Sequence, residues 1–105
     1  MNEDEDGLDE IVRRIVQVAA PERIILFGST ARGEAGPDSD FDLLVIKAGV
    51  YRRLDVMRDI YRNLRGASRA VDVVVVTPED VERYINTHAL VIAPALREGR
   101  VIYAA

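Results

Sequence analysis

The sequence predicts an α/β (α+β) domain, in which helices flank one mixed β-sheet. Two observations predict this fold class: apolar residues recur at helical spacing in several segments, and short apolar runs typical of buried strands lie between them. The length of 105 residues suits a single domain with its own core. We therefore expect residues 1–105 to form one domain, with residues 1–7 as a frayed acidic N-terminus.

The first third of the chain predicts a helix followed by a strand. Apolar residues at helical spacing indicate a helix over residues 7–19, which Pro21 ends. Residues 23–27 form a short apolar run that is typical of a buried strand. Gly28 ends this strand, and a short helical turn over residues 29–33 is expected to follow it.

A second strand is expected over residues 40–46, after a loop rich in the residue types that favour turns. Successive side chains of a strand point to opposite faces of its sheet. One face of this strand is therefore expected to carry Asp40, Asp42, Leu44 and Ile46, and the other to carry Phe41, Leu43 and Val45.

A second helix and a third strand are expected next. The helix is marked by apolar residues at helical spacing, namely Val50, Leu54, Met57, Ile60, Tyr61 and Leu64. Gly66 is expected to cap its C-terminus, and the valine-rich run over residues 71–76 is typical of a buried strand. Several arginines crowd around this helix. We interpret them as a solvated face, with a docking surface for an acidic protein or for RNA as the alternative.

The last quarter of the chain predicts a third helix, a short fourth helix and an edge strand. Thr77 and Asp80 flank a proline and have the spacing of a capped helix start. The buried face of that helix is expected to consist of Val81, Tyr84 and Ile85. Pro94 is expected to open the fourth helix and Gly99 to close it, before a final strand over residues 101–103.

Charge is unevenly distributed along the chain. Six of the 18 acidic residues lie within the first ten positions, and the rest of the chain sets 12 acidic residues against 14 Lys and Arg. We interpret the acidic start as a solvated terminus, with partner docking as the alternative. A nearly neutral body does not indicate direct nucleic-acid binding. The chain has no cysteine, and its start lacks the basic and apolar segments of a secretion signal, so we expect a cytoplasmic protein.

Asp40 and Asp42 are the strongest sign of chemistry in the sequence. Two carboxylates on one face of a strand repel each other, and one tends to take up a proton unless a cation neutralises them. Carboxylate oxygens suit Mg²⁺, which keeps several waters and shares the phosphates of a substrate. We therefore interpret the pair as metal ligands. The simpler alternative is two solvated acids on a strand.

Gly28 and Ser29 are candidates for binding phosphate groups upstream of the two acids. The first backbone N–H groups of a helical turn have no partner within the turn, and they favour anions. Gly28 permits a close approach of the backbone, the Ser29 hydroxyl adds a donor, and Arg32 carries a planar guanidinium within reach of the same phosphates. As alternatives, Ser29 is an ordinary helix cap and Arg32 a surface arginine.

Asp72 is the third candidate carboxylate. It lies in a run of valines, where an unpaired buried acid would be costly, so we expect a neighbouring strand to place it beside Asp40 and Asp42. The three acids then form a site for two Mg²⁺ ions, in which Asp72 binds the ion that holds an acceptor hydroxyl and accepts its proton. The alternative is an edge-strand acid that faces water.

The segment GSTARGEAGPDSDFDLLV has the spacing of a known family signature. It resembles the signature of the DNA polymerase β-like nucleotidyltransferase superfamily, and most of all its minimal nucleotidyltransferase (MNT) branch. In that signature a Gly-Ser pair precedes Asp-x-Asp by ten residues and a third Asp follows on a later strand; here these are Gly28, Ser29, Asp40, Asp42 and Asp72. The resemblance implies the polymerase β-like palm fold and transfer of a nucleoside monophosphate, with ATP as the favoured donor.

The resemblance also implies a partner. MNT proteins of this size pair with small helical HEPN RNase toxins, and the MNT antitoxin is thought to silence the toxin by transferring AMP to a tyrosine hydroxyl. Two alternatives stay open: the same chemistry on RNA or a small molecule, and an antitoxin that only occludes its partner. No apolar run approaches the length of a membrane span, so no membrane contact is expected.

Overall fold

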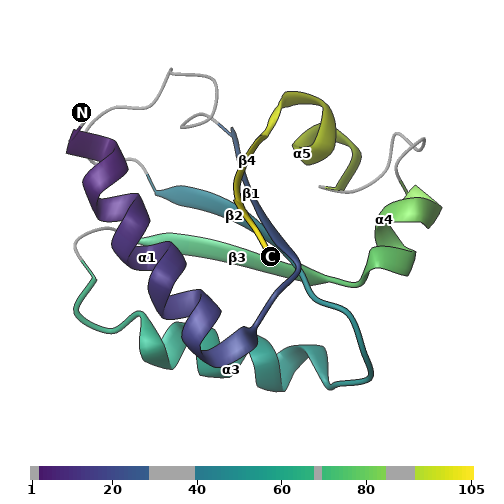
Figure 1. Cartoon of the computed structure of the whole chain (residues 1–105), viewed down its shortest axis with the longest axis horizontal. Helices are drawn as coiled ribbons and strands as arrows, with labels where there is room; N and C mark the ends of the chain where they lie inside the picture. The colour runs from purple at the N-terminus through teal and green to yellow at the C-terminus, as the bar shows by residue number, and fades with distance from the viewer. Residues whose placement is uncertain (1–2, 29–39, 68–69, 85–91) are drawn as a thin grey trace.

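The computed structural model describes residues 3–28, 40–67, 70–84 and 92–105 (Figure 1). Its elements in chain order are α1 (Glu3–Ala19), β1 (Arg23–Phe27), β2 (Phe41–Ile46), α3 (Arg53–Asn63), β3 (Val71–Val76), α4 (Pro78–Tyr84), α5 (Ile92–Glu98) and β4 (Arg100–Ala104). This order of helices and strands is the predicted one. No helix within these ranges is long and apolar enough to cross a bilayer.

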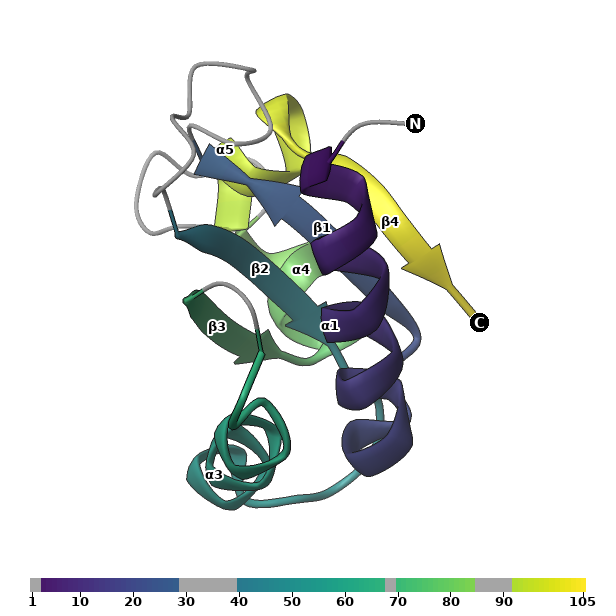
Figure 2. The same ribbon diagram turned by 90° about the vertical axis from the view of Figure 1, so that its left-hand side faces the viewer.

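Within the described residues, the strands form one sheet of four in the order β3-β2-β1-β4. β1 pairs antiparallel with β2 and with β4, whereas β2 pairs parallel with β3, so the sheet is mixed as predicted. A parallel pair needs a crossover connection, and α3 lies in the one between β2 and β3. β3 and β4 are therefore the two edges of the sheet (Figure 2).

α1 and α3 cover one face of the sheet and build the larger part of the core (Figure 2). Phe41, Leu43 and Val45 face these helices and are fully buried, which confirms the predicted alternation along β2. The helices contribute Leu8, Ile11, Ile15, Ala19, Ile60 and Leu64 to the same cluster. Removal of this apolar surface from water is the main force that stabilises the fold.

α4 and α5 cover part of the opposite face (Figure 1). The cluster there consists of Ile25, Leu44, Ile46, Val76, Val81 and Ala95. It confirms the predicted placement of Leu44, Ile46 and Val81, whereas the predicted contributions of Tyr84 and Ile85 concern side chains outside the described part of the chain. The cluster draws on the later residues of β2 and β3, so the acids at the start of both strands lie beside it rather than within it.

Two helices begin earlier than the sequence predicts. α1 begins at Glu3, so residues 3–7, which we expected in a frayed terminus, are helical. Negative side chains near the N-terminus of a helix favour the helical state, which accounts for the extension. α5 begins at Ile92 and not at Pro94, because proline is tolerated within the first turn of a helix.

The predicted second helix is confirmed as α3, but not all of the apolar residues that mark it lie on its buried side. Ile60 and Leu64 are buried, whereas Val50 precedes the helix and is fully exposed. Leu54 is 71% exposed and Tyr61 is 41% exposed. Apolar residues occupy two sides of this helix, and the protein core covers only one of them.

Local interactions fix the ends of the helices. The Thr77 amide donates to Asp80 Oδ2 and the Asp80 amide donates to Thr77 Oγ1, both at 3.0 Å, which is the predicted capping arrangement. Gly66 turns the chain after α3 with a φ of 82°, a conformation that favours glycine. Lys47 Nζ donates to the Ala19 carbonyl at 2.6 Å, and a cation at the C-terminal end of a helix is favourable.

Candidate active site

The candidate carboxylates lie at the start of the two parallel strands. β2 and β3 pair in register, so the Cα of Asp42 is opposite the Cα of Asp72. The core-facing neighbours of both residues point towards α1 and α3. Alternation therefore directs Asp42 and Asp72 to the opposite face, together with Asp40, which lies two residues before Asp42.

The three acids differ in exposure. Asp42 is half-buried, whereas Asp40 and Asp72 are exposed. An exposed acid on an edge strand is what the simpler interpretation of Asp72 also expects. The feature that points beyond that interpretation is the register, which sets Asp72 directly opposite a second, partly buried carboxylate.

Burial and charge act together on Asp42. Partial burial raises the pKa of the Asp42 carboxyl above its usual range, and the negative charges of Asp72 and then Asp40 raise it further. All of these influences act in the same direction, so the ionised form of Asp42 is disfavoured at this position. A cation beside the three acids would reverse that balance.

Gly28 has a role in this site that the sequence analysis did not predict. Its φ is 75°, and a Cβ built on it would overlap the Asp42 carboxylate at Oδ2 and lie 3.2 Å from Cγ. The backbone of Gly28 therefore touches the side chain of Asp42, and any larger residue would displace the carboxylate. The sequence signal that could have found this contact is the position of Gly28 directly after a predicted strand, where a residue without a side chain permits a close approach.

The carboxylates fit a divalent cation by their chemistry, although they do not form a closed cage. All three donors are carboxylate oxygens, which Mg²⁺ prefers, and Asp40, Asp42 and Asp72 are the residues that would hold it. Within the described ranges, no three acidic or histidine side chains converge closely enough to enclose one ion. An open set suits a metal that takes its other ligands from water and from substrate phosphates.

Several predicted site residues lie outside the described part of the chain. Ser29 and Arg32, the other two candidates for phosphate binding, belong to residues 29–39, as does the predicted helical turn. The phosphate side of the site is therefore represented in the described structure by Gly28, which lies between β1 and that segment.

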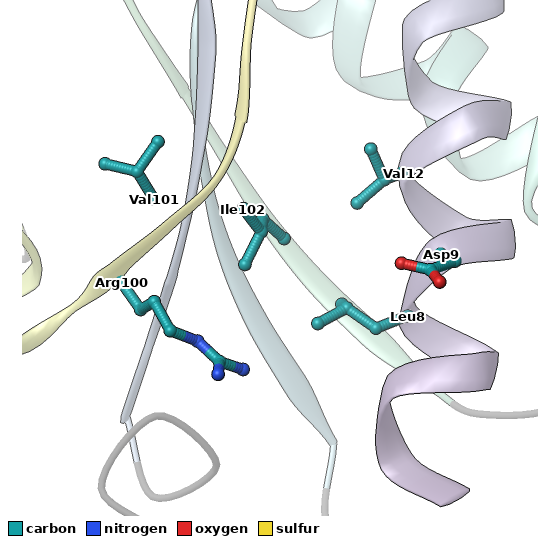
Figure 3. Close-up of a pocket in the computed structure, with 6 residues that line it drawn as sticks. All are labelled: Leu8, Asp9, Val12, Arg100, Val101 and Ile102. Carbon is teal, nitrogen blue, oxygen red and sulfur yellow. The ribbon is translucent and has the colours of Figure 1, made fainter. Parts of the chain in front are cut away.

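A surface hollow of about 230 Å³ lies at the other edge of the sheet, between α1 and β4 (Figure 3). Its lining residues are Leu8, Asp9, Val12, Arg100, Val101 and Ile102. None of the candidate site residues lines it. β4 and β3 are opposite edges of the sheet, so we do not assign this hollow to the nucleotide.

Fold and site together define a class of protein. Three carboxylates at one end of a mixed sheet, with Gly28 against one of them, suit the binding of phosphates through metal ions. Residues 6–102 match the family described as the nucleotidyltransferase domain, and the chain belongs to that family. Its class of chemistry is therefore nucleotidyl transfer. A comparison with curated protein sequences finds no match.

Solved structures with the same fold include enzymes and a toxin–antitoxin complex. A protein of Sulfolobus solfataricus assigned as a nucleotidyltransferase has a TM-score of 0.65 and 24% identity, and the match covers 94% of this chain and 78% of that one. A mutant of the toxin–antitoxin complex MntA-HpeT has a TM-score of 0.57 and 19% identity, and the match covers 100% of this chain and 74% of that one. Spectinomycin adenyltransferase AAD(9) of Enterococcus faecialis, with ATP and spectinomycin, has a TM-score of 0.54 and 16% identity. That match covers 97% of this chain and 55% of the other.

Proposed function

We propose that this chain is an Mg²⁺-dependent antitoxin that transfers AMP from ATP to a tyrosine hydroxyl of a HEPN RNase toxin. One observation carries the proposal: Asp42 and Asp72 lie directly opposite each other on parallel strands, with Asp40 on the same face. That set supplies oxygen ligands for a pair of metal ions. The proposal includes a cytoplasmic location, because ATP is available in that compartment.

The proposed reaction forms one bond to phosphorus and breaks another. The acceptor oxygen attacks the α-phosphorus of ATP, the bond to the bridging oxygen breaks, and pyrophosphate leaves with the electron pair of that bond. When bound, Mg²⁺ neutralises charge on the attacking and leaving oxygens. Asp72 is exposed and accepts the proton of the acceptor hydroxyl. Gly28, Ser29 and Arg32 bind the phosphates through backbone N–H groups, a hydroxyl and a guanidinium.

Two observations support a protein acceptor. The chain aligns over its whole length with a chain of the toxin–antitoxin complex MntA-HpeT. The match covers 74% of that toxin–antitoxin chain but 55% of the spectinomycin adenyltransferase chain, so the domain corresponds to a larger share of the toxin–antitoxin protein. An acceptor held by a separate protein is positioned by the contacts between the two proteins.

The proposal is tested by measuring the intact mass of the HEPN protein encoded beside this chain, after incubation with ATP and Mg²⁺. The wild-type chain is expected to add one or more AMP units to that protein. The Asp40→Ala/Asp42→Ala variant is expected to add none. The matched control, Asp9→Ala/Asp59→Ala, removes two exposed acids from α1 and α3 and is expected to act as wild type.

The outcomes separate the competing functions. Absence of AMP on the toxin, together with binding and neutralisation by the carboxylate variant, would establish occlusion as the mechanism. Absence of both transfer and binding would direct the search to RNA or small-molecule acceptors. Equal loss of transfer in the site variant and the control variant would contradict a specific role for the β2 acids.

A further inference from the structure

α3 carries an exposed stripe of alternating apolar and basic side chains. Leu54, Arg58, Tyr61 and Arg65 follow one another at intervals of four, three and four residues, which places them on one side of the helix and of the turn that continues it. Leu54 and Tyr61 are 71% and 41% exposed, and both arginines are exposed. We call these four residues the α3 stripe.

The contacts of α3 fix the direction in which the stripe points. On one side, Asn63 Nδ2 donates to the Arg14 carbonyl of α1 at 2.8 Å. On the other side, the Tyr61 hydroxyl accepts a hydrogen bond from the Val73 amide of β3 at 2.9 Å. The stripe therefore faces away from α1 and flanks the β3 edge of the sheet, beneath which α3 lies in Figure 2.

This position brings the stripe close to Asp72, the carboxylate that is proposed to take the proton from the acceptor hydroxyl. Val73, which contacts Tyr61, directly follows Asp72 in β3. β3 is an edge of the described sheet, so one strand separates the side of the stripe from the face on which Asp72 lies. A partner seated on the stripe therefore reaches Asp72 by passing the edge of β3.

Tyr61 also restricts how a partner binds at this edge. Unpaired N–H groups of an edge strand are a template for pairing with a strand of another chain. The Val73 amide, however, already donates to the Tyr61 hydroxyl. Addition of a strand at Val73 would have to displace the Tyr61 hydroxyl, which favours a partner that binds here through side chains.

The chemistry of the stripe suits an acidic protein surface better than RNA. The ion pair between Arg58 and Asp55 is exposed, at 3.4 Å, and such pairs contribute little, so a partner carboxylate competes readily for Arg58. Arginine binds carboxylates through two parallel hydrogen bonds. Leu54 and the exposed Val50 just before the helix add aliphatic surface, which protein interfaces bury and a phosphate backbone does not use.

We infer that the α3 stripe is the docking surface for an acidic, partly apolar surface of the protein that carries the acceptor hydroxyl. The inference rests on the proposed function for the identity of that protein, the HEPN toxin. Docking at the stripe holds the acceptor beside Asp72 and replaces a random encounter by a positioned one.

The test measures binding of the chain to the purified HEPN protein encoded beside it, by isothermal titration calorimetry. Arg58→Glu/Arg65→Glu is expected to raise the Kd at least about tenfold, because it opposes like charges across the interface. Leu54→Ser is expected to raise it through lost apolar burial. The control, Arg13→Glu/Arg97→Glu, makes the same charge change at exposed positions outside the stripe and is expected to bind as wild type. The replaced side chains are exposed, so the melting temperatures should stay close to that of wild type.

Several results would overturn the docking surface. These are unchanged toxin affinity in the stripe variants, equal loss in the stripe and control variants, or no toxin binding by the wild type. Another is a stripe variant that loses a short single-stranded RNA while it keeps the toxin. Asp72→Asn is expected to bind the toxin as wild type does, while AMP transfer falls about a thousandfold. A wild-type chain that binds through the stripe but transfers no AMP would refute the proposed function and leave the docking surface standing.

Discussion

The two faces of the sheet use the same strands for different purposes. Towards α1 and α3, β2 presents only apolar, fully buried side chains, from Phe41 to Val45. Towards α4 and α5, it presents Asp42 at its start and Leu44 and Ile46 further along. One face therefore stabilises the fold along the whole strand, whereas the other is divided between a core and a candidate site.

This difference shows how a small domain can hold a charged site without interrupting its core. Asp42 lies between Phe41 and Leu43, yet the alternation of strand side chains separates the carboxylate from both. A slip of one residue in the pairing of β2 would turn the acids into the core and the apolar residues out of it. The buried face thus enforces the register that sets Asp42 opposite Asp72.

The largest effect is expected on the face of the sheet that carries the acids, where AMP transfer should be lost without loss of the fold. Asp72→Asn keeps the side-chain size and removes a charge from the site. We expect AMP transfer to fall about a thousandfold, because metal-assisted charge stabilisation contributes several kcal/mol. Asp72 is exposed and its charge raises the pKa of Asp42, so the free energy of unfolding should not fall. Rates from intact mass and urea titrations check both parts; a destabilised variant would contradict the separation of the two faces.

The opposite result, a loss of stability, is expected at Phe41, one residue before Asp42. Phe41 is fully buried against α1 and α3, and Phe41→Ala leaves a cavity there. The free energy of unfolding should fall by about 3–5 kcal/mol. Urea denaturation followed by circular dichroism measures this loss. A change below about 1 kcal/mol would show that this face is not the stabilising one.

An intermediate effect is expected at Gly28, where the two functions of the sheet meet. Gly28→Ala forces a positive φ on a residue with a Cβ, at a cost of about 1–3 kcal/mol, and pushes the Asp42 carboxylate aside. We expect AMP transfer to fall about 10–100-fold, as when a group that orients a metal ligand is lost.

Gly66 offers a matched control for Gly28. It also has a positive φ, of 82°, but a Cβ built on it meets nothing within 4 Å. Gly66→Ala should therefore destabilise the fold to a similar extent and leave transfer unchanged. If both variants lost transfer equally, backbone strain rather than the contact with Asp42 would be the cause.

The sequence predicted the strands because their signals are local. Alternation in β2 and the capping pair Thr77 and Asp80 depend on neighbouring residues, and the structure confirms both. The exposed side of α3 was not predictable in this way. Leu54 and Tyr61 lie on one side of α3 and Ile60 on another, and only the packing of α3 on the sheet decides which side is buried.

Placement of the candidate site residues was predictable only in part. Alternation puts Asp40 and Asp42 on one face, but the sequence does not contain the register that sets Asp72 opposite Asp42. The contact between Gly28 and the Asp42 carboxylate likewise depends on how β1 and β2 pair. Both arrangements join residues from different segments of the chain, so a pattern within one segment does not predict them.

Partial burial of Asp42, together with the negative charges of Asp72 and Asp40, has a defined effect on stability. The pKa of Asp42 is raised in the folded protein, so the folded state holds this proton more tightly than the unfolded chain does. The stabilising contribution is full below the usual pKa of an aspartate and is lost as the pH rises through the raised value. A divalent cation that binds the three acids should restore stability, by about 2.7 kcal/mol at a concentration a hundred times its Kd.

The most direct measurement is therefore the melting temperature of the wild type and of Asp42→Asn/Asp72→Asn, with and without Mg²⁺, at about pH 7.5 and about pH 4. The wild type should gain stability from Mg²⁺ at the higher pH and less at the lower, where a larger share of the Asp42 carboxyl is protonated because its pKa is raised. The double variant should melt above the metal-free wild type at the higher pH and gain nothing from Mg²⁺. An equal Mg²⁺ effect in both proteins would contradict a metal site on the acids of β2 and β3.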